Sequence, residues 1–238
     1  MDTYLQITSV WGVYLAGVVF LGGMAWRIYE WKTTPKSPIR LGMFPKPATR
    51  AGRIVKMLKD TLIAPQSAQI EPRMWIFAMA FHLAALAAFV GHLRIVQEYP
   101  ILPELLGHDG MNAFAGWAGG IAGVVMMVAV MYWIARRTFG PFKNLSVPED
   151  YLLLVLLFGI IIMGNHMRFF GEGVHAADYR EWFTSLLVFK PVIPDSLSSV
   201  GWSLGTHMLF VDAFLIYFPF SKLVHTIGSF SANLVRSE

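Results

Sequence analysis

Four histidines stand in two pairs inside long apolar stretches of this sequence. His82 and His92 lie ten residues apart in FHLAALAAFVGHLR, and His207 and His225 lie eighteen residues apart in a later stretch. An ionisable side chain inside a membrane-length apolar segment is costly, so each is a candidate functional residue. Imidazole is also a common axial ligand of haem iron. The four residues therefore predict cofactor chemistry inside a membrane.

The two spacings predict how the histidines pair. On a helix, ten residues place His82 and His92 about 80° apart around the axis and about 15 Å apart along it. Eighteen residues make about five turns, so His207 and His225 would share one face of a continuous helix, about 27 Å apart. Antiparallel packing then pairs His92 with His207 near one membrane surface and His82 with His225 near the other. The two spacings differ by about 12 Å, which helix tilt and Pro219 would partly absorb.

Haem suits these pairs better than other metal centres do. Each pair offers two imidazoles, without the further ligands that a tetrahedral zinc site needs. The chain has no cysteine, which excludes iron–sulfur clusters held by this chain alone and covalent haem attachment. We therefore expect two haem b groups, with the four histidines as ligands of the haem iron, and no catalytic residue. Gly91 and Gly205 would let the flat ring approach the backbone. The alternative is that the histidines only form hydrogen bonds between helices.

The composition indicates that lipid surrounds most of the chain. Of the 238 residues, 55% are hydrophobic and 14% are charged, and the mean hydropathy is +0.53. The apolar residues form blocks of about 20, the length that a helix needs to cross the hydrocarbon core of a bilayer. The fold class is therefore all-α, an integral membrane bundle of five transmembrane helices in one domain. The expected spans are Val10–Trp31, Met74–Val96, Ala113–Ile134, Tyr151–Phe170 and Leu204–Ile227.

Lysine and arginine predict the orientation of these spans. Fifteen of the nineteen basic residues fall on one side, ten of them between the end of the first span and Arg73. The positive side is cytoplasmic, so we expect the N-terminus outside, the C-terminus in the cytoplasm and residues 32–73 as a basic cytoplasmic segment. Within it, residues 51–62 read as a basic amphipathic helix that contacts anionic lipid, docks a cytoplasmic partner, or does both. Because topology explains the basic residues, we expect no nucleic-acid partner.

Polar residues near the outer ends of the spans are candidates for binding a quinone. His108 and Asp109 are expected in the loop after the second span, and His166 and Arg168 at the outer end of the fourth. Each could hydrogen-bond a quinone carbonyl beside the His92–His207 haem. Lys222, three residues before His225, marks a competing inner site. Asp212 lies in the last span, where we expect it to bind a neighbouring hydroxyl group. The alternative is that it tunes a haem or carries a proton.

The two histidine-bearing helices resemble those of the gamma subunit of respiratory nitrate reductase and its relatives. WGVYLAGVVFLGGMAWR and FAGWAGGIAG resemble the first and third helices of that family. PEDYLLLVLLFGIIIMGNHMRFF, LVFKP and IYFPFSKLVH are more similar to one branch, the cytochrome b subunit of a sulfur-metabolism complex associated with dissimilatory sulfite reductase. One departure concerns residues 100–112, which contain no lysine or arginine, whereas the nitrate reductase subunits place a lysine there, near their quinone site.

The resemblance implies a di-haem b subunit of a respiratory complex in the cell's inner (plasma) membrane. Such a subunit exchanges electrons between quinone, either menaquinone or ubiquinone, and a cytoplasmic iron–sulfur subunit related to heterodisulfide reductase, within a complex of further subunits. A gamma subunit of nitrate reductase is the first alternative. A transporter whose histidines relay protons and a membrane anchor without redox chemistry are alternatives of other classes.

Overall fold

A computed structural model describes residues 3–35, 47–99, 101–171 and 176–230. The elements in these ranges are all helical, as expected. The longer labelled elements are α1 (Thr3–Gln6), η1 (Ile7–Trp11), α2 (Gly12–Thr33), α3 (Arg50–Leu62), α4 (Pro65–Ile70), α5 (Pro72–His92), α6 (Ile101–Phe139), η3 (Pro141–Leu145), α7 (Pro148–Phe170), α8 (Ala176–Leu187), η4 (Asp195–Val200) and α9 (Gly201–Tyr217). The three-residue turns are η2 (Leu93–Ile95), η5 (Phe218–Phe220) and η6 (Lys222–Val224), and residues 225–230 are also helical.

Five helical stretches in the described residues are long and apolar enough to cross a membrane. Many of their large apolar side chains face outward, among them Val18, Phe89 and Trp117. Such exposure is expected where lipid, rather than water, is the solvent. The stretches are Thr3–Thr33, Pro72–Ile95, Ile101–Phe139, Pro148–Phe170 and Asp195–Phe220. Of the predicted cytoplasmic basic residues, Lys36, Arg40, Lys46 and Arg236 lie outside the described residues.

The chain forms two compact units. The first contains Met1–Gly17 and Ala80–Phe214, and the second contains Val18–Met79 and Leu215–Glu238. Helices α2, α5 and α9 therefore each contribute residues to both units.

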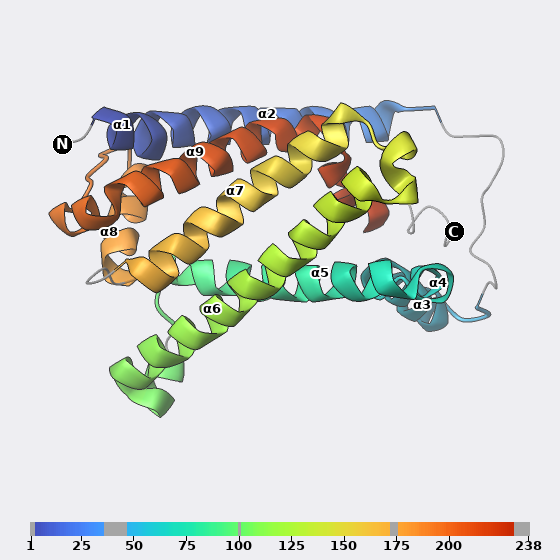
Figure 1. The fold of residues 1–238 in the computed structure, drawn as a ribbon, viewed down its shortest axis with the longest axis horizontal. Helices are drawn as coiled ribbons and strands as arrows, with labels where there is room; N and C mark the ends of the chain where they lie inside the picture. The colour runs from blue at the N-terminus through green and yellow to red at the C-terminus, as the bar shows by residue number, and fades with distance from the viewer. Residues whose placement is uncertain (1–2, 36–46, 100, 172–175, 231–238) are drawn as a thin grey trace. The chain divides into compact units, whose positions relative to one another are not determined.

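In the first unit, α6 and α7 lie side by side because glycines on α6 make room for side chains of α7 (Figure 1). Asn165 fills the space beside Gly123, where an added Cβ would collide with its amide oxygen. Phe169 packs in the same way against Gly120, 3.3 Å from the position of a Cβ. Small residues allow close helix packing in membranes, where hydrophobicity does not drive helices together.

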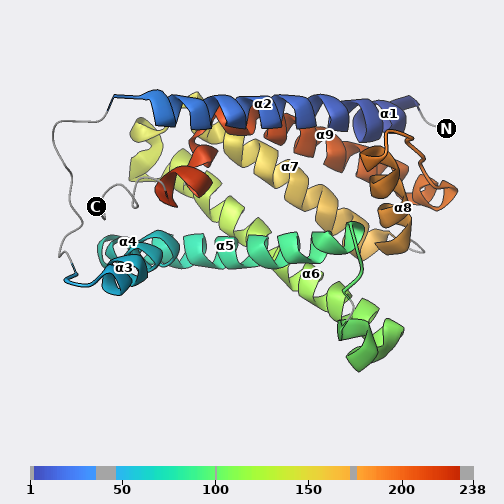
Figure 2. The same ribbon diagram turned by 180° about the vertical axis from the view of Figure 1, so that it is seen from behind.

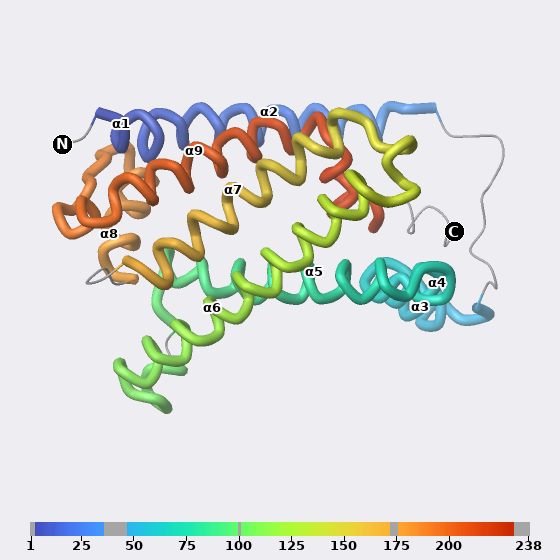
Figure 3. The backbone as a smooth tube through the Cα atoms, in the orientation of Figure 1, coloured from blue at the N-terminus to red at the C-terminus, as the bar shows by residue number. Residues whose placement is uncertain are grey.

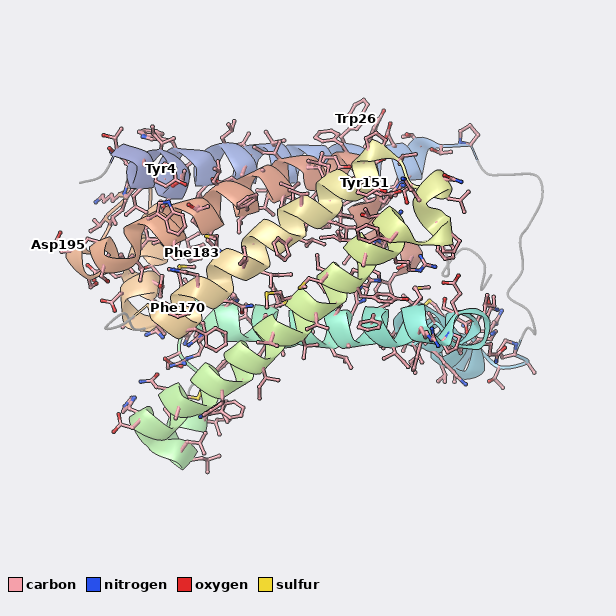
Figure 4. All side chains as sticks on the ribbon, viewed as in Figure 1. Tyr4, Trp26, Tyr151, Phe170, Phe183 and Asp195 are labelled. Atoms are coloured by element: carbon pink, nitrogen blue, oxygen red, sulfur yellow. The ribbon has the colours of Figure 1, made fainter. Side chains whose placement is uncertain are left out.

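A second cluster in this unit joins the N-terminal helix to α8 (Figure 2). The turn Ile7–Trp11 is π-helical, and the carbonyl of Ser9 within it accepts a hydrogen bond from the buried indole of Trp182 at 3.0 Å. The hydroxyl of Tyr14 donates to the carbonyl of Leu186 at 2.9 Å. The hydroxyls of Tyr4, labelled in Figure 4, and Thr206 share a hydrogen bond of 3.0 Å that holds α9 to α1.

Two local features differ from the sequence prediction. The stretch expected to be a loop before the third span is mostly helical and belongs to α6, which turns sharply at Gly107, where φ is +71° (Figure 3). His108 and Asp109 therefore lie on a helix, and their predicted place in a loop was wrong.

The expected continuous helix from Leu204 to Ile227 was also wrong. The α-helix ends at Tyr217, and the chain becomes extended at Ser221, with φ −110° and ψ 176°. Pro219 lacks the N–H that a continuing helix needs, and its ring clashes with the preceding turn. The apolar pattern runs through this break, so the pattern alone did not show it.

The second unit contains the C-terminal part of α2 together with residues that follow α9. Phe20 packs edge-on against Phe218, with 5.4 Å between ring centroids. In the same unit, the indole of Trp75 at the start of α5 donates to the carbonyl of Ile63 at 2.6 Å. This bond ties the end of the α3 region to the start of a membrane span.

Candidate haem site

His92 and His207 come together in the first unit. His92 is the last residue of α5 and is exposed, whereas His207 lies on α9 and is partly buried. The two side chains are close enough to interact electrostatically. The structure therefore brings one predicted ligand pair into the same region of the bundle.

Hydrogen bonds to the backbone orient both imidazoles. Nδ1 of His92 lies 2.7 Å from the carbonyl oxygen of Ala88, one turn earlier on α5. Nδ1 of His207 lies 2.9 Å from the carbonyl oxygen of Ile160 on α7. A carbonyl oxygen only accepts, so Nδ1 carries the proton in each ring and the lone pair of Nε2 is available to a metal. Histidines that bind a metal usually show this arrangement, in which the ring nitrogen that does not bind the metal donates a hydrogen bond.

The remaining predicted ligands belong to different units. His82 lies on the part of α5 in the first unit, is exposed, and meets Phe81 edge-on with 5.6 Å between ring centroids. His225 follows η6 in the second unit, and its Nδ1 lies 2.8 Å from the carbonyl oxygen of Lys222. His225 thus shares the Nδ1–carbonyl bond seen at His92 and His207. The pairing of His82 with His225 remains a prediction.

The donor chemistry fits a haem group. His92 and His207 each present an Nε2 lone pair, and an iron that receives its other four ligands from a macrocycle needs only two imidazoles. A Cβ on Gly91, beside His92, would meet open space, as the approach of a flat ring requires. Gly205 has a different role from the one expected. A Cβ there would lie 2.7 Å from the ring of Tyr4, so this glycine serves the packing of α9 against α1.

An ion-pair network follows His92 directly. The buried guanidinium of Arg94 donates to both carboxylate oxygens of Glu98, at 2.6 and 2.9 Å, and to Asn112 at 3.0 Å. Arg180 on α8 donates to Glu98 at 2.8 Å and to the carbonyl oxygen of Arg94 at 2.9 Å. The hydrogen bonds from Arg94, assisted by Arg180, lower the pKa of Glu98 to about 2 even though burial opposes the shift. The network joins α8 and the start of α6 to the end of α5.

The four quinone candidates occupy different places. His108 and Asp109 follow the turn at Gly107 in α6, and in the described part of the chain no hydrogen bond or ring contact joins them to His166 or Arg168. His166 on α7 contacts two aromatic rings, with 5.4 Å to the centroid of Phe170 and 5.8 Å to that of Trp202 on α9. Its Nδ1 is buried and has no hydrogen-bond partner among the described residues.

Arg168 on α7 lies beside α6 and near α8. Its guanidinium is 3.4 Å from the position that a Cβ on Gly119 would take. It also interacts electrostatically with Tyr179 on α8, where burial raises the pKa of the phenol and the charge of Arg168 opposes that rise. Of the four candidates, His166 and Arg168 are thus the two that α7 places against neighbouring helices.

The sequence profile of the nitrate reductase gamma subunit family matches residues 56–237 of this chain. The chain belongs to this family. The match covers every helix from the middle of α3 onward and all four predicted haem ligands. With five helices able to span a bilayer, this gamma-family chain is a multi-pass protein of the plasma membrane.

Individual relatives come from two kinds of complex. The Hdr-like menaquinol oxidoreductase cytochrome b-like subunit of Archaeoglobus profundus is 30% identical over 164 residues, which cover 65% of this chain and 47% of the relative. The subunit of the same name from Archaeoglobus fulgidus is 27% identical over an alignment that covers 94% of this chain and 78% of the relative. The respiratory nitrate reductase 1 gamma chain of Escherichia coli is 25% identical over 61% of this chain and 67% of its own length. The chain spans about half the length of the first of these relatives.

Sequence reasoning about this gamma-family chain missed several site residues. Arg94 and Glu98 stand four residues apart, a spacing that favours a helical ion pair and could have been noticed. Trp202 beside His166 carried no signal beyond that of an interface aromatic residue. The carbonyl of Ile160 that orients His207 could not have been found, because any residue of a neighbouring helix offers a carbonyl.

Proposed function

We propose that this chain is a di-haem b membrane subunit that passes electrons between menaquinol and a cytoplasmic iron–sulfur subunit. The observation that carries the proposal is the pair His92 and His207, which come from two different helices, interact electrostatically, and each keep Nε2 free by bonding Nδ1 to a carbonyl. The names of the two Archaeoglobus relatives favour menaquinol over ubiquinol.

The residues of this chain would bind and orient the cofactors. His92 with His207, and His82 with His225, would each hold one haem b, which when bound supplies a one-electron carrier inside the membrane. The positive-inside distribution of lysine and arginine supports the N-terminus outside and the C-terminus in the cytoplasm. In this orientation the His92–His207 pair lies toward the outer surface and the His82–His225 pair toward the cytoplasm.

A quinone head group fits best beside His166. The imidazole has a buried Nδ1 without a partner among the described residues, and it contacts two aromatic rings. A buried polar atom without a partner costs free energy, which a ligand that hydrogen-bonds to it would recover. Arg168, two residues later, adds a cationic donor. His108 and Asp109 would complete the outer surface, and Lys222 remains the marker of the competing inner site.

The complex would resemble an Hdr-like oxidoreductase more than a nitrate reductase. The similarity to the Archaeoglobus fulgidus subunit extends over 94% of the chain, whereas that to the Escherichia coli gamma chain covers 61%. We therefore propose a partner related to heterodisulfide reductase, linked to sulfite reduction, together with further subunits and with lipid around the spans. A gamma subunit of nitrate reductase is the alternative within the same family.

Haem content and ligand substitution test the proposal. Pyridine haemochrome analysis of the purified protein should give about two b haems per chain. His92→Ala and His207→Ala should abolish the same redox transition, and His82→Ala and His225→Ala the other. Leu209→Ala, an exposed neighbour on α9, is the control and should keep both. Absence of haem would refute the cytochrome and favour a transporter or an anchor, whereas a shared phenotype of His82→Ala and His92→Ala would refute the pairing.

A further inference from the structure

The break after α9 is built from contacts with α2 within the second unit. Pro219 is fully buried in η5, although it lies where a membrane helix was expected to continue. A Cβ on Gly23 would lie 2.6 Å from Cβ and 2.8 Å from Cγ of this proline. Ordinary contacts between such carbons are about 3.5–4.0 Å, so only glycine at position 23 allows α2 to approach Pro219 this closely.

Arg27, one turn after Gly23 on α2, completes the contact. Its Nε–H donates to the carbonyl oxygen of Pro219 at 2.8 Å, and its Nη1 contacts Glu30 at 3.1 Å. The carbonyl of a residue at a helix break has lost its partner in the following turn, and leaving it unpaired in an apolar region is costly. Arg27 therefore satisfies the group that the break exposes, and Glu30 holds the guanidinium in place.

A series of hydrogen bonds between residues close in sequence then leads from the break to His225. The hydroxyl of Ser221 donates to the carbonyl of Phe218 at 3.0 Å and accepts from the N–H of Leu223 at 3.1 Å. The N–H of His225 in turn donates to the carbonyls of Leu223 and Lys222, and its imidazole bonds to the latter at 2.8 Å. With these bonds in place, the position of Pro219 fixes the position of His225 and the direction of its Nε2.

We infer that Gly23 and Arg27 are positioning residues for His225, and so for the inner haem. The inference rests on the proposed function, because it assigns a role toward a cofactor that His225 would bind. It also assigns α2 a function although α2 carries no histidine. The break replaces the rigid five-turn spacing between His207 and His225 with one that contacts from α2 determine.

Two neighbouring glycines provide a matched experiment. Gly22→Ala and Gly23→Ala make the same chemical change one residue apart, but a Cβ on Gly22 meets open space and one on Gly23 meets Pro219. We expect Gly23→Ala to lose the inner haem, or to shift its midpoint potential and its low-spin electron paramagnetic resonance signal, while the outer haem keeps both. Gly22→Ala should leave both haems unchanged.

Substitutions at Arg27 test the same inference through its hydrogen bond to Pro219, without adding a Cβ at the contact between α2 and Pro219. Arg27→Met should alter the inner haem in the same way, Arg27→Lys should restore much of its signal by keeping a cationic donor, and Glu30→Gln should have a smaller effect. An unchanged inner haem in both Gly23→Ala and Arg27→Met would overturn the inference, and so would equal damage to both haems, which indicates a general loss of structure. A wild-type protein without a second haem would instead overturn the proposed function and this inference with it.

Discussion

At the scale of single residues, the sequence shows which histidines could be ligands, whereas the fold determines how each imidazole is oriented. Their type and spacing were visible in the sequence, and they predicted two pairs on two helices. Their orientation depends on carbonyl groups, such as that of Ile160 for His207, which the fold brings from another helix. An imidazole without such a bond could present either nitrogen, so this bond determines which atom is available to iron.

Glu98 gives a prediction about pH at the same scale. Its pKa is lowered to about 2 in the folded protein from an ordinary value of 4.5, chiefly by the hydrogen bonds from Arg94. A group whose pKa is depressed by folding stabilises the fold above its unfolded pKa and loses that contribution as the pH falls toward its folded pKa. The attachment of α8 should therefore weaken progressively between pH 4.5 and about 2.

Hydrogen exchange of the α8 backbone amides in detergent, measured across this range, checks the prediction. Protection should decrease on acidification in the wild type. Glu98→Gln should start lower at neutral pH and change little across the same window, because it cannot titrate. Asp195→Asn, which removes an exposed carboxylate, should behave as the wild type does. Protection of α8 that is independent of pH in the wild type would show that the network does not hold this helix.

At the scale of elements, the sequence predicted the helices that depend on local composition. It missed the features that depend on contacts with distant parts of the chain. Five apolar blocks predicted five membrane-length helices. The helix α8 was not predicted, because its burial depends on the hydrogen bond from Trp182 to the Ser9 carbonyl of a π-helical turn. The sequence around Trp182 does not indicate that contact. The break at Pro219 escaped because proline occurs within membrane helices whose neighbours satisfy the freed groups, and only the structure shows Arg27 in that role.

The amphipathic helix α3 also belongs to this scale. Its apolar stripe, formed by Ile54, Val55, Leu58 and Leu62, is 40–64% exposed, and its opposite face carries Arg53 and Lys56. The bond between Trp75 and Ile63 ties the helix region to the start of a membrane span. The stripe is therefore suited to the acyl chains at the membrane surface. The basic face would then be available to the proposed soluble partner.

We expect charge reversal on that basic face to release the partner. The double substitution Arg53→Glu and Lys56→Glu should reduce the amount of iron–sulfur subunit that copurifies, since complementary charge guides and holds such partners. Both haem signals should remain. Lys143→Glu, an exposed basic residue of η3, is the control for charge alone. Quantitative mass spectrometry of the purified complex measures the outcome, and a complete complex in the double variant would assign α3 to lipid only.

At the scale of the whole molecule, the predicted orientation of the chain in the membrane determines the direction in which electrons and protons would move. The histidine pair His92–His207 and the candidate quinone residues His166 and Arg168 belong to the predicted outer side. The basic segments belong to the predicted cytoplasmic side. Oxidation of a quinol on the outer side would release its protons there while the electrons moved inward. The same chain with quinol entering beside Lys222 would release protons on the cytoplasmic side and would not separate charge in this way.

Removing one haem distinguishes these two routes. If quinol reacts at the outer side, electrons reach the inner haem only through the outer one. In His207→Ala, a quinol analogue should then leave the inner haem oxidised in stopped-flow spectra, although dithionite still reduces it. His166→Ala should slow reduction of both haems without removing either, because it would weaken the quinone contact and leave the histidine ligands intact. Lys222→Ala should have no effect on the rate. Rapid reduction of the inner haem by the quinol analogue in His207→Ala, with slowing only in Lys222→Ala, would place the quinone on the cytoplasmic side and reverse the proposed direction of proton release.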